Sequence, residues 1–235
     1  MTCPDPLPRN HAKIIRYKIY KHLIKKYLDK EIGWSDKALK PLRDKIRHSM
    51  RDSQKQTCYY CRRSISIERR NIGEAIEHFL DKSKPHYRKW AFHPLNLVIA
   101  CQPCNMEKST KDLGDQNMQN AKHLLPSLGD FRWLHPYFDS YDSNIEIAPG
   151  PIYSAILGAP KQQEAYNMIN ELKLDSLPNI DDRVQKSALD IQKLQKRMYR
   201  LVTDHTQGFI SPRRRRLADE IDARLDRAMF EIFKI

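Results

Sequence analysis

The sequence predicts an α+β protein in which a small cysteine-rich module lies within a mainly helical chain. Glycine is scarce, with 7 among 235 residues, which argues against a sandwich or barrel that needs many tight turns. Apolar residues recur at helical spacing near both ends of the chain, whereas two short β-prone runs and two Cys-x-x-Cys pairs lie between them. We therefore predict three regions: a basic helical one over 1–55, the module over 56–115 and a helical one over 116–235.

The first region predicts two helices. One is expected over residues 9–31, with Gly33 as its stop. Its apolar stripe repeats every four residues and comprises Ile15, Ile19, Leu23 and Tyr27. A second helix is expected after an N-cap at Ser35, and Pro41 would interrupt or restart it. The apolar positions of this helix are Leu39, Leu42 and Ile46.

The module predicts two strands and a helix. Residues 73–79 form the first expected strand, which ends near His78, and residues 96–100 form the second. A helix is expected over 105–113, with Gly114 as its stop. After residue 116 helices are expected over 160–174, 184–204 and 212–234. An aromatic cluster spans 133–139, and four consecutive arginines, 213–216, stand at a helix start.

Two cysteine pairs predict a structural zinc site. The four residues are Cys58, Cys61, Cys101 and Cys104. Each Cys-x-x-Cys turn aims two sulfurs at one point, and four thiolates in a tetrahedron suit Zn²⁺ and leave no open coordination position. Such a metal would contribute to folding and not to catalysis. Because 39 residues separate Cys61 from Cys101, more than a plain zinc ribbon needs, the insert is expected to have a role of its own.

Charge and hydropathy indicate the cellular setting. The N-terminus lacks the apolar core of a signal peptide, and no run approaches the roughly 20 apolar residues that span a bilayer, so we expect a cytoplasmic protein without membrane contact. The net charge is +13, and the first 57 residues hold 15 Lys and Arg against 6 Asp and Glu. This excess favours a nucleic-acid partner, and the alternative is an ordinary solubilising charge.

A combination of short motifs resembles the HNH family of endonucleases. In chain order the motifs are Glu77-His78, Asn96-Leu97, Cys101-x-x-Cys104-Asn105 and Lys108. The chain is similar over residues 56–112 to the variant with Asn at the third motif position. This resemblance implies a ββα-metal fold and metal-dependent hydrolysis of phosphodiester bonds. The sequence departs from the family where Glu77 replaces the frequent Asp and where Asn105 replaces the His.

The resemblance also implies a role for each motif residue. His78 would be the general base, because the pKa of an imidazole lies near physiological pH. Glu77 and Asn105 would hold a hard divalent cation such as Mg²⁺. Asn96 would brace the loop and orient the His78 ring. Four basic side chains near the cysteines would contact phosphate or be surface charges: Arg62, Arg63, Lys108 and Lys111. Two histidines of the insert, His86 and His93, fit either a substrate contact or an ordinary loop.

The order of the regions carries a narrower resemblance. A basic helix, an HNH module and a helical half that begins with the run from Trp133 to Asp139 resemble the HNH nuclease subunit of Septu-type antiphage systems, including those attached to retrons. The resemblance implies a separate ATPase partner of the ABC/SMC type, and in some systems a retron reverse transcriptase with its nucleic acid. This chain has no Walker-type phosphate loop, so the ATPase would be another protein.

Two other interpretations stay open at the level of sequence. One is a non-catalytic zinc module that binds nucleic acid or protein, and the other is a zinc-stapled helical adaptor with a degenerate HNH insert. Both leave Glu77, His78 and Asn105 without a role. The polymer also stays open, because no residue marks recognition of a 2′-hydroxyl; DNA is the default and RNA such as tRNA is the alternative.

Overall fold

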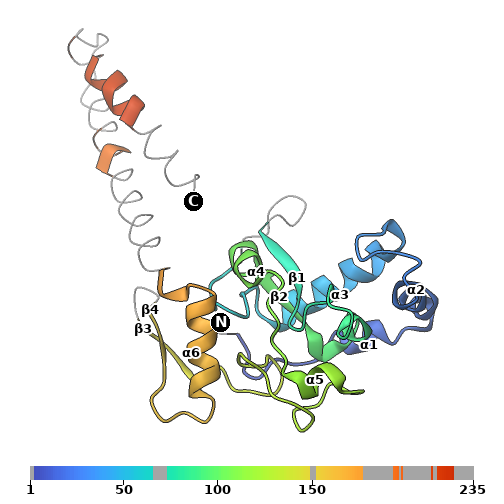
Figure 1. Ribbon diagram of the computed structural model, residues 1–235. Coiled ribbons are helices and arrows are strands. Elements are labelled where there is room, and N and C mark those ends of the chain that lie inside the picture. Colours follow the sequence, from blue (N-terminus) through green and yellow to red (C-terminus); the bar gives the residue numbers. More distant parts are fainter. Residues whose placement is uncertain are drawn as a thin grey trace. The chain divides into compact units, whose positions relative to one another are not determined.

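The protein folds into two compact units in the computed structural model (Figure 1), which describes residues 3–65, 73–148 and 152–176 together with 193–195, 197, 213 and 216–224. The first unit comprises Met1–Ile147 with Tyr153–Leu174, and the second comprises Ala148–Ile152 with Asp175–Ile235. The boundaries expected at 55 and 115 lie inside the first unit. The N-terminal helices and the cysteine module therefore belong to one body.

The helix expected over residues 9–31 is two helices. Helix α1 (Ala12–Ile15) and helix α2 (Lys18–Leu28) are separated at Tyr17, whose ψ of 129° is extended and not helical. Helix α2 ends before Gly33, since Lys30 already has a left-handed φ of 65°. The break changes the buried face: Tyr20 and Tyr27, two turns apart, are buried, whereas 63% of Ile19 is exposed. The predicted stripe was therefore wrong at Ile19.

The second N-terminal helix has a different N-cap from the one expected, and its predicted apolar positions are buried. Asp36, not Ser35, caps a short 3-10 turn η1 (Lys37–Leu39), and its carboxylate accepts a hydrogen bond of 2.8 Å from the Ala38 amide. Helix α3 (Lys40–Ser53) follows with Pro41 in its first turn, so this proline restarts the helix. The predicted apolar positions are confirmed as fully buried: Leu39, Leu42 and Ile46.

The central element is a two-stranded antiparallel sheet. Strand β1 (Glu74–His78) pairs with strand β2 (Leu97–Cys101), and the register places Glu74 opposite Cys101 and His78 opposite Leu97. Both expected strands are confirmed, within one or two residues at their ends. Two short 3-10 turns lie between them, η3 (Arg88–Trp90) and η4 (Pro94–Asn96).

The helix after the sheet begins earlier than expected. Helix α4 (Gln102–Lys108) starts directly after Cys101, which is its N-cap, and packs against β1 and β2 (Figure 1). Pro103 in the first turn favours this start. The helix ends at Lys108, because Ser109 has a φ of 48°. The expected helix is therefore confirmed over 105–108, and its predicted continuation to 113 was wrong. Gly114 lies beyond the helix, and its carbonyl accepts a hydrogen bond from the Tyr87 hydroxyl.

The region after residue 116 combines expected helical segments with two strands that were not predicted. It contains helix α5 (Gln116–Asn120), a two-stranded sheet of β3 (Ile145–Ala148) and β4 (Ile152–Ala155), the expected helix α6 (Gln162–Glu171) and the 3-10 turn η5 (Leu174–Ser176). Of the helices expected over 184–204 and 212–234, the described residues 193–195, 197, 213 and 216–224 are helical. The remainder, including Arg214 and Arg215, lies outside the described residues. No described helix is long and apolar enough to cross a bilayer.

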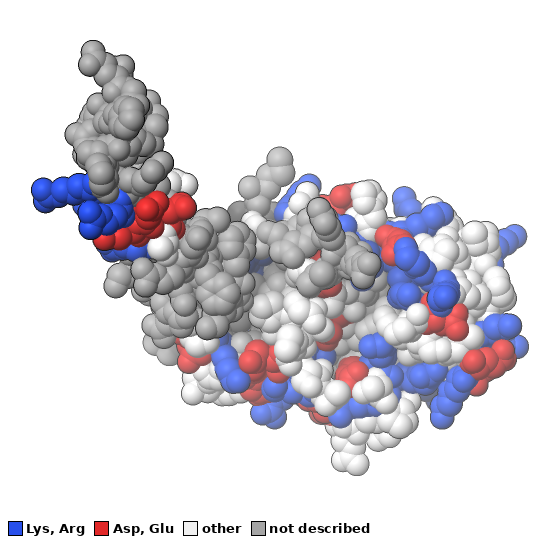
Figure 2. Space-filling view, turned by 90° about the horizontal axis from the view of Figure 1, so that it is seen from above, with Lys and Arg blue, Asp and Glu red and all other residues white. Residues whose placement is uncertain are grey.

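The basic N-terminal region is not a uniform positive surface. In Figure 2 Lys and Arg are interspersed with Asp and Glu over the part of the molecule where Figure 1 places α2 and α3. Two arginines of α3 are turned inward to Glu74, whose side chain is 1% exposed: Arg51 Nη2 lies 2.5 Å and Arg47 Nε 3.1 Å from its carboxylate. Two of the positive charges counted in this region are thus paired with a buried carboxylate and do not contribute to an open basic surface.

The aromatic cluster of residues 133–139 is buried in its first half and half-buried from Tyr137 onward. Trp133, Leu134 and His135 are completely buried. The His135 imidazole lies 4.0 Å from the Phe138 ring and 4.7 Å from the Phe79 ring, centroid to centroid. Burial, aided by the charge of His93, lowers the pKa of His135 well below its ordinary value. The Tyr137 amide donates to Nδ1 at 3.2 Å, so the ring is held as a neutral acceptor.

The depressed pKa of His135 predicts a loss of stability in acid. The folded ring stays neutral, whereas the unfolded chain takes up a proton below a pH of about 6.5, so stability present above that pH is lost as the pH falls. His135→Asn keeps an acceptor and removes the titration. It should flatten the pH dependence between pH 7 and 5 by up to about 1.4 kcal/mol per pH unit in urea unfolding. The exposed His48, changed to Asn, is the control; an unchanged slope in His135→Asn would contradict this explanation.

Candidate metal centre and a neighbouring histidine

The four predicted cysteines meet at one point. The sulfurs of Cys58, Cys61, Cys101 and Cys104 all lie within 4.8 Å of one another, and no disulfide joins them. The Cys61 and Cys101 sulfurs are 3.8 Å apart. Tetrahedral Zn–S bonds of about 2.3 Å would place sulfurs about 3.8 Å from one another. The cluster is therefore consistent with a zinc site.

One buried glutamine fixes the first cysteine pair against the sheet. Gln54, at the end of α3, is 2% exposed. Its side-chain carbonyl accepts from the Ile99 amide at 2.7 Å, and its NH₂ group donates to the Ile99 carbonyl at 2.9 Å and to the Thr57 carbonyl at 3.0 Å. The Tyr59 amide donates to the same Ile99 carbonyl at 3.1 Å. Since β2 runs directly into Cys101, these bonds bring the two pairs together.

Tyrosine hydroxyls tie the first pair to the later part of the chain. Three hydroxyl-to-carbonyl hydrogen bonds do so: Tyr59 to Leu134 at 2.8 Å, Tyr141 to Tyr60 at 2.8 Å and Tyr153 to Cys61 at 2.5 Å. Burial raises the pKa of each of these phenols, so all three remain protonated donors. The cysteine turn is thereby held by residues more than 70 positions away along the chain.

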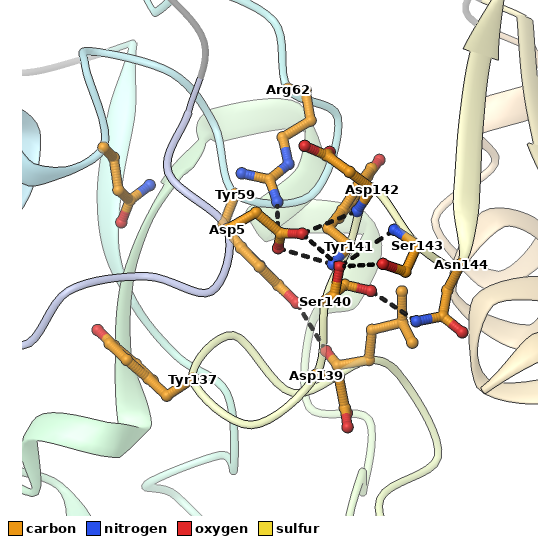
Figure 3. A network of polar contacts seen from close by, with 12 residues as sticks. Asp5, Tyr59, Arg62, Tyr137, Asp139, Ser140, Tyr141, Asp142, Ser143 and Asn144 are labelled. Carbon is orange, nitrogen blue, oxygen red and sulfur yellow. Dashed lines mark hydrogen bonds and ion pairs between the residues drawn. The ribbon is translucent and has the colours of Figure 1, made fainter. Parts of the chain in front are cut away.

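Arg62 belongs to a structural network with Asp5 (Figure 3). The Asp5 carboxylate accepts from the amides of Tyr141 at 2.7 Å and Asp142 at 3.0 Å, and from the Ser140 hydroxyl at 2.6 Å. The Arg62 guanidinium lies 3.4 Å from Asp5 and 4.1 Å above the Tyr141 ring, and its side chain is 10% exposed. Arg62 therefore packs inward and is not a surface charge.

The other basic candidates differ from one another in position. Arg63 is exposed beside the first pair. The ammonium of Lys111, which is half-buried, donates to the Glu107 carbonyl. Lys108 is completely buried, so it is not a surface charge either. Among the histidines of the insert, His86 lies 3.5 Å from Asp112, and the His93 ring accepts from the Leu95 amide at 3.3 Å.

His78 is held in one tautomer at the end of β1. Its Nε2 lies 3.0 Å from the Ala91 carbonyl oxygen. Because a carbonyl only accepts, Nε2 carries the proton and Nδ1 keeps its lone pair. No described residue makes a hydrogen bond to Nδ1. Burial, with the positive charges of Lys82 and Lys108, lowers the pKa of His78 well below its ordinary value. The ring is therefore a neutral base with a defined accepting nitrogen.

Asn96 braces the segment around His78. It is completely buried, and its side-chain carbonyl accepts from the Leu80 amide at 2.7 Å. Its NH₂ group donates to the carbonyls of Leu80 at 3.0 Å and Trp90 at 3.2 Å. Leu80 follows His78 by two residues, and Trp90 precedes the residue whose carbonyl holds the His78 ring. Asn96 therefore links the backbone after His78 to the backbone before Ala91.

The two expected cation ligands are not assembled as a pair. The Glu77 carboxylate lies 2.6 Å from the Lys108 ammonium, and both side chains are almost completely buried. Burial raises the pKa of Glu77, and the Lys108 charge opposes that rise. Asn105 lies one turn before Lys108 on α4 and is half-buried, and no described contact joins its side chain to Glu77. The Lys108 ammonium thus neutralises the Glu77 carboxylate.

Sequence reasoning missed the groups that enclose His78. The Trp34 ring meets the imidazole edge-on at 4.4 Å between centroids, and the Lys82 ammonium lies 5.6 Å from the Trp34 centroid. With these neighbours His78 is 2% exposed. A lone tryptophan in a polar stretch was the available signal for Trp34, and no motif marks Lys82.

Comparisons with protein families, curated proteins and solved structures found no match to this chain. The sulfur cluster is closed and suits a structural metal, whereas the His78 ring offers a free basic nitrogen.

The sulfur cluster predicts a large and specific effect of one cysteine substitution. Cys101→Ser should reduce bound zinc from about one ion per chain to almost none and unfold the module, because structural zinc contributes about 10–16 kcal/mol in finger peptides, as much as a domain's whole stability. Elemental analysis and thermal circular dichroism would measure both. Cys3→Ser is the matched control, since Cys3 is buried outside the cluster. A stable, zinc-loaded Cys101→Ser protein would rule out the four-thiolate site.

Proposed function

We propose that the chain is an HNH-type endonuclease that hydrolyses phosphodiester bonds in nucleic acid, with His78 as general base and a structural Zn²⁺ on the four cysteines. The observation that carries this proposal is the hydrogen bond from His78 Nε2 to the Ala91 carbonyl. It fixes the tautomer whose Nδ1 can remove a proton from water. The order of β1, β2 and α4 beside the cluster supports the ββα-metal assignment.

The charges around His78 suit an anionic substrate. Lys82 and Lys108 both depress the pKa of the ring, together with its burial. A phosphodiester bound nearby would offset these positive charges and raise the affinity of Nδ1 for a proton. The base would then be strengthened when the substrate is in place. Asn96 would keep the ring and the Ala91 carbonyl in register during this change.

A hard divalent cation such as Mg²⁺ is part of the proposal and is the part that the geometry supports least. Glu77 and Asn105 would be its oxygen ligands, and the ion would stabilise negative charge on the phosphate. Because Glu77 is paired with Lys108 at 2.6 Å, the present arrangement does not fit a bound cation. Glu77 would have to turn away from Lys108 before it could serve as a ligand.

The proposed setting is an antiphage defence complex. By the narrower resemblance, the chain would be the effector nuclease beside a separate ABC/SMC-type ATPase, and in retron-attached systems beside a reverse transcriptase and its nucleic acid. The Trp34 ring lies against His78, which is almost completely buried, and a substrate would have to displace the Trp34 ring to reach it. This supports the proposal that the chain is inactive without its partner. DNA is the default polymer, and RNA such as tRNA is the alternative.

A non-catalytic zinc module that binds nucleic acid or protein is the second candidate. The buried Glu77–Lys108 ion pair favours it, because this pair gives both residues a structural role without any chemistry. The same holds for a zinc-stapled adaptor with a degenerate insert. Under these alternatives the bond from His78 to the Ala91 carbonyl would only tie β1 to the segment before β2.

Cleavage by wild type and His78→Ala separates the candidates. Plasmid DNA, single-stranded DNA and total RNA would be incubated with each protein, with Mg²⁺ or EDTA, and with any neighbouring ATPase. The proposal expects metal-dependent cleavage of one polymer and a loss of about 100-fold or more in His78→Ala, because the general base is removed. His48→Ala, an exposed histidine on α3, is the control. Equal cleavage by His78→Ala, or none by zinc-loaded wild type with its ATPase, would favour the binding module.

A further inference from the structure

A cavity of about 520 Å³ lies beside α1, and neither His78 nor the four cysteines line it. Its basic lining comprises Arg9, Lys13, Arg16, His93 and His123. The first three come from α1 and its flanks, His93 from the turn before β2, and His123 from the segment after α5. Three parts of the chain thus direct positive or titratable groups at one hollow, and no carboxylate lines it.

These cations have no internal counterion, unlike other arginines of the same region. Arg47 and Arg51 bind Glu74, and Arg62 binds Asp5. In the described part of the chain, by contrast, Arg9, Lys13 and Arg16 are exposed and form no ion pair with a carboxylate. Burial lowers the pKa of His93, and the nearby charges of Arg9, Arg16 and His123 lower it further. No carboxylate contributes an opposite effect. The positive field over the cavity is therefore uncompensated.

The cavity also has an apolar side and firmly placed walls. Leu95 and Leu124 are buried in its lining, and Leu125 is 46% exposed. His11, completely buried next to α1, has its Nε2 at 2.9 Å from the Pro94 carbonyl, which joins α1 to the turn η4. The same turn ends at Asn96, which braces the His78 segment. A ligand in this cavity would contact the turn that positions the candidate base.

We infer that this cavity binds a nucleic-acid strand, with phosphate at Arg9, Lys13 and Arg16 and sugar or base against the leucines. Guanidinium and ammonium groups without counterions suit phosphate, since each neutralised phosphate releases condensed counterions. A mixed basic and apolar lining suits a nucleotide better than a free inorganic anion. The choice of nucleic acid as the ligand rests on the proposed function. The cavity would add a substrate contact outside the HNH motif.

Binding measured without cleavage tests the inference. The full chain would carry His78→Ala, and its affinity for labelled 20-nucleotide DNA, RNA and duplex would be followed by fluorescence anisotropy across a salt series. The triple variant Arg9→Gln, Lys13→Gln, Arg16→Gln should bind at least about tenfold more weakly than the parent. The slope of log affinity against log salt should fall by about 2 to 3 for three lost phosphate contacts.

The matched control removes the same charge from the neighbouring helix. Lys18→Gln, Lys21→Gln, Lys25→Gln changes three exposed lysines of α2, and circular dichroism would verify that both triples are folded. The inference is supported if the α1 triple loses affinity and slope and the α2 triple loses clearly less. Equal losses, or an α1 triple that binds like the parent, would overturn it, as would a parent that binds none of the three polymers. Because binding alone is measured, an absence of cleavage in wild type would count against the proposed catalysis and leave the cavity's role intact.

Discussion

The convergence of four sulfurs within 4.8 Å is the constraint on which the rest of the structure depends. Burial raises the pKa of the Cys58 thiol, whereas a bound metal cation would hold this residue as a thiolate. A two-stranded sheet is marginal by itself in water. The cluster closes this sheet onto the first cysteine turn, and Gln54 and the tyrosine hydroxyls then join that turn to α3 and to the later chain.

The sheet separates the four-sulfur cluster from His78. Its register places Cys101 at one end, opposite Glu74, and His78 at the other, opposite Leu97. Five-residue strands span about 13 Å at about 3.3 Å per residue. A closed sulfur site at one end would thus fix the backbone, while the imidazole at the other end is set by the Ala91 carbonyl and by Asn96. Such a division would let a metal on the four cysteines fix the position of His78 without touching it.

The sequence predicted the parts that local pattern controls. Cysteine spacing gave the cluster, β-prone runs gave β1 and β2, and Leu39, Leu42 and Ile46 were recognised as core. Pairings between distant residues could not be predicted. Arg62 points inward because it pairs with Asp5, which lies 57 positions earlier in the chain. Lys108, on α4, is buried because it pairs with Glu77 on β1. The sequence shows which side chains are charged, whereas the fold decides which of them form buried ion pairs. Others, such as Arg9 and Arg16, remain exposed to a ligand.

The most direct test of the sulfur constraint is zinc-edge X-ray absorption on the purified full chain. Four cysteines as ligands predict a first shell of four sulfurs at about 2.3 Å and no nitrogen or oxygen. A mixed shell, or a folded protein that contains no metal, would contradict the structural role given to the cluster. The positions of β1, α4 and His78 would then need another cause.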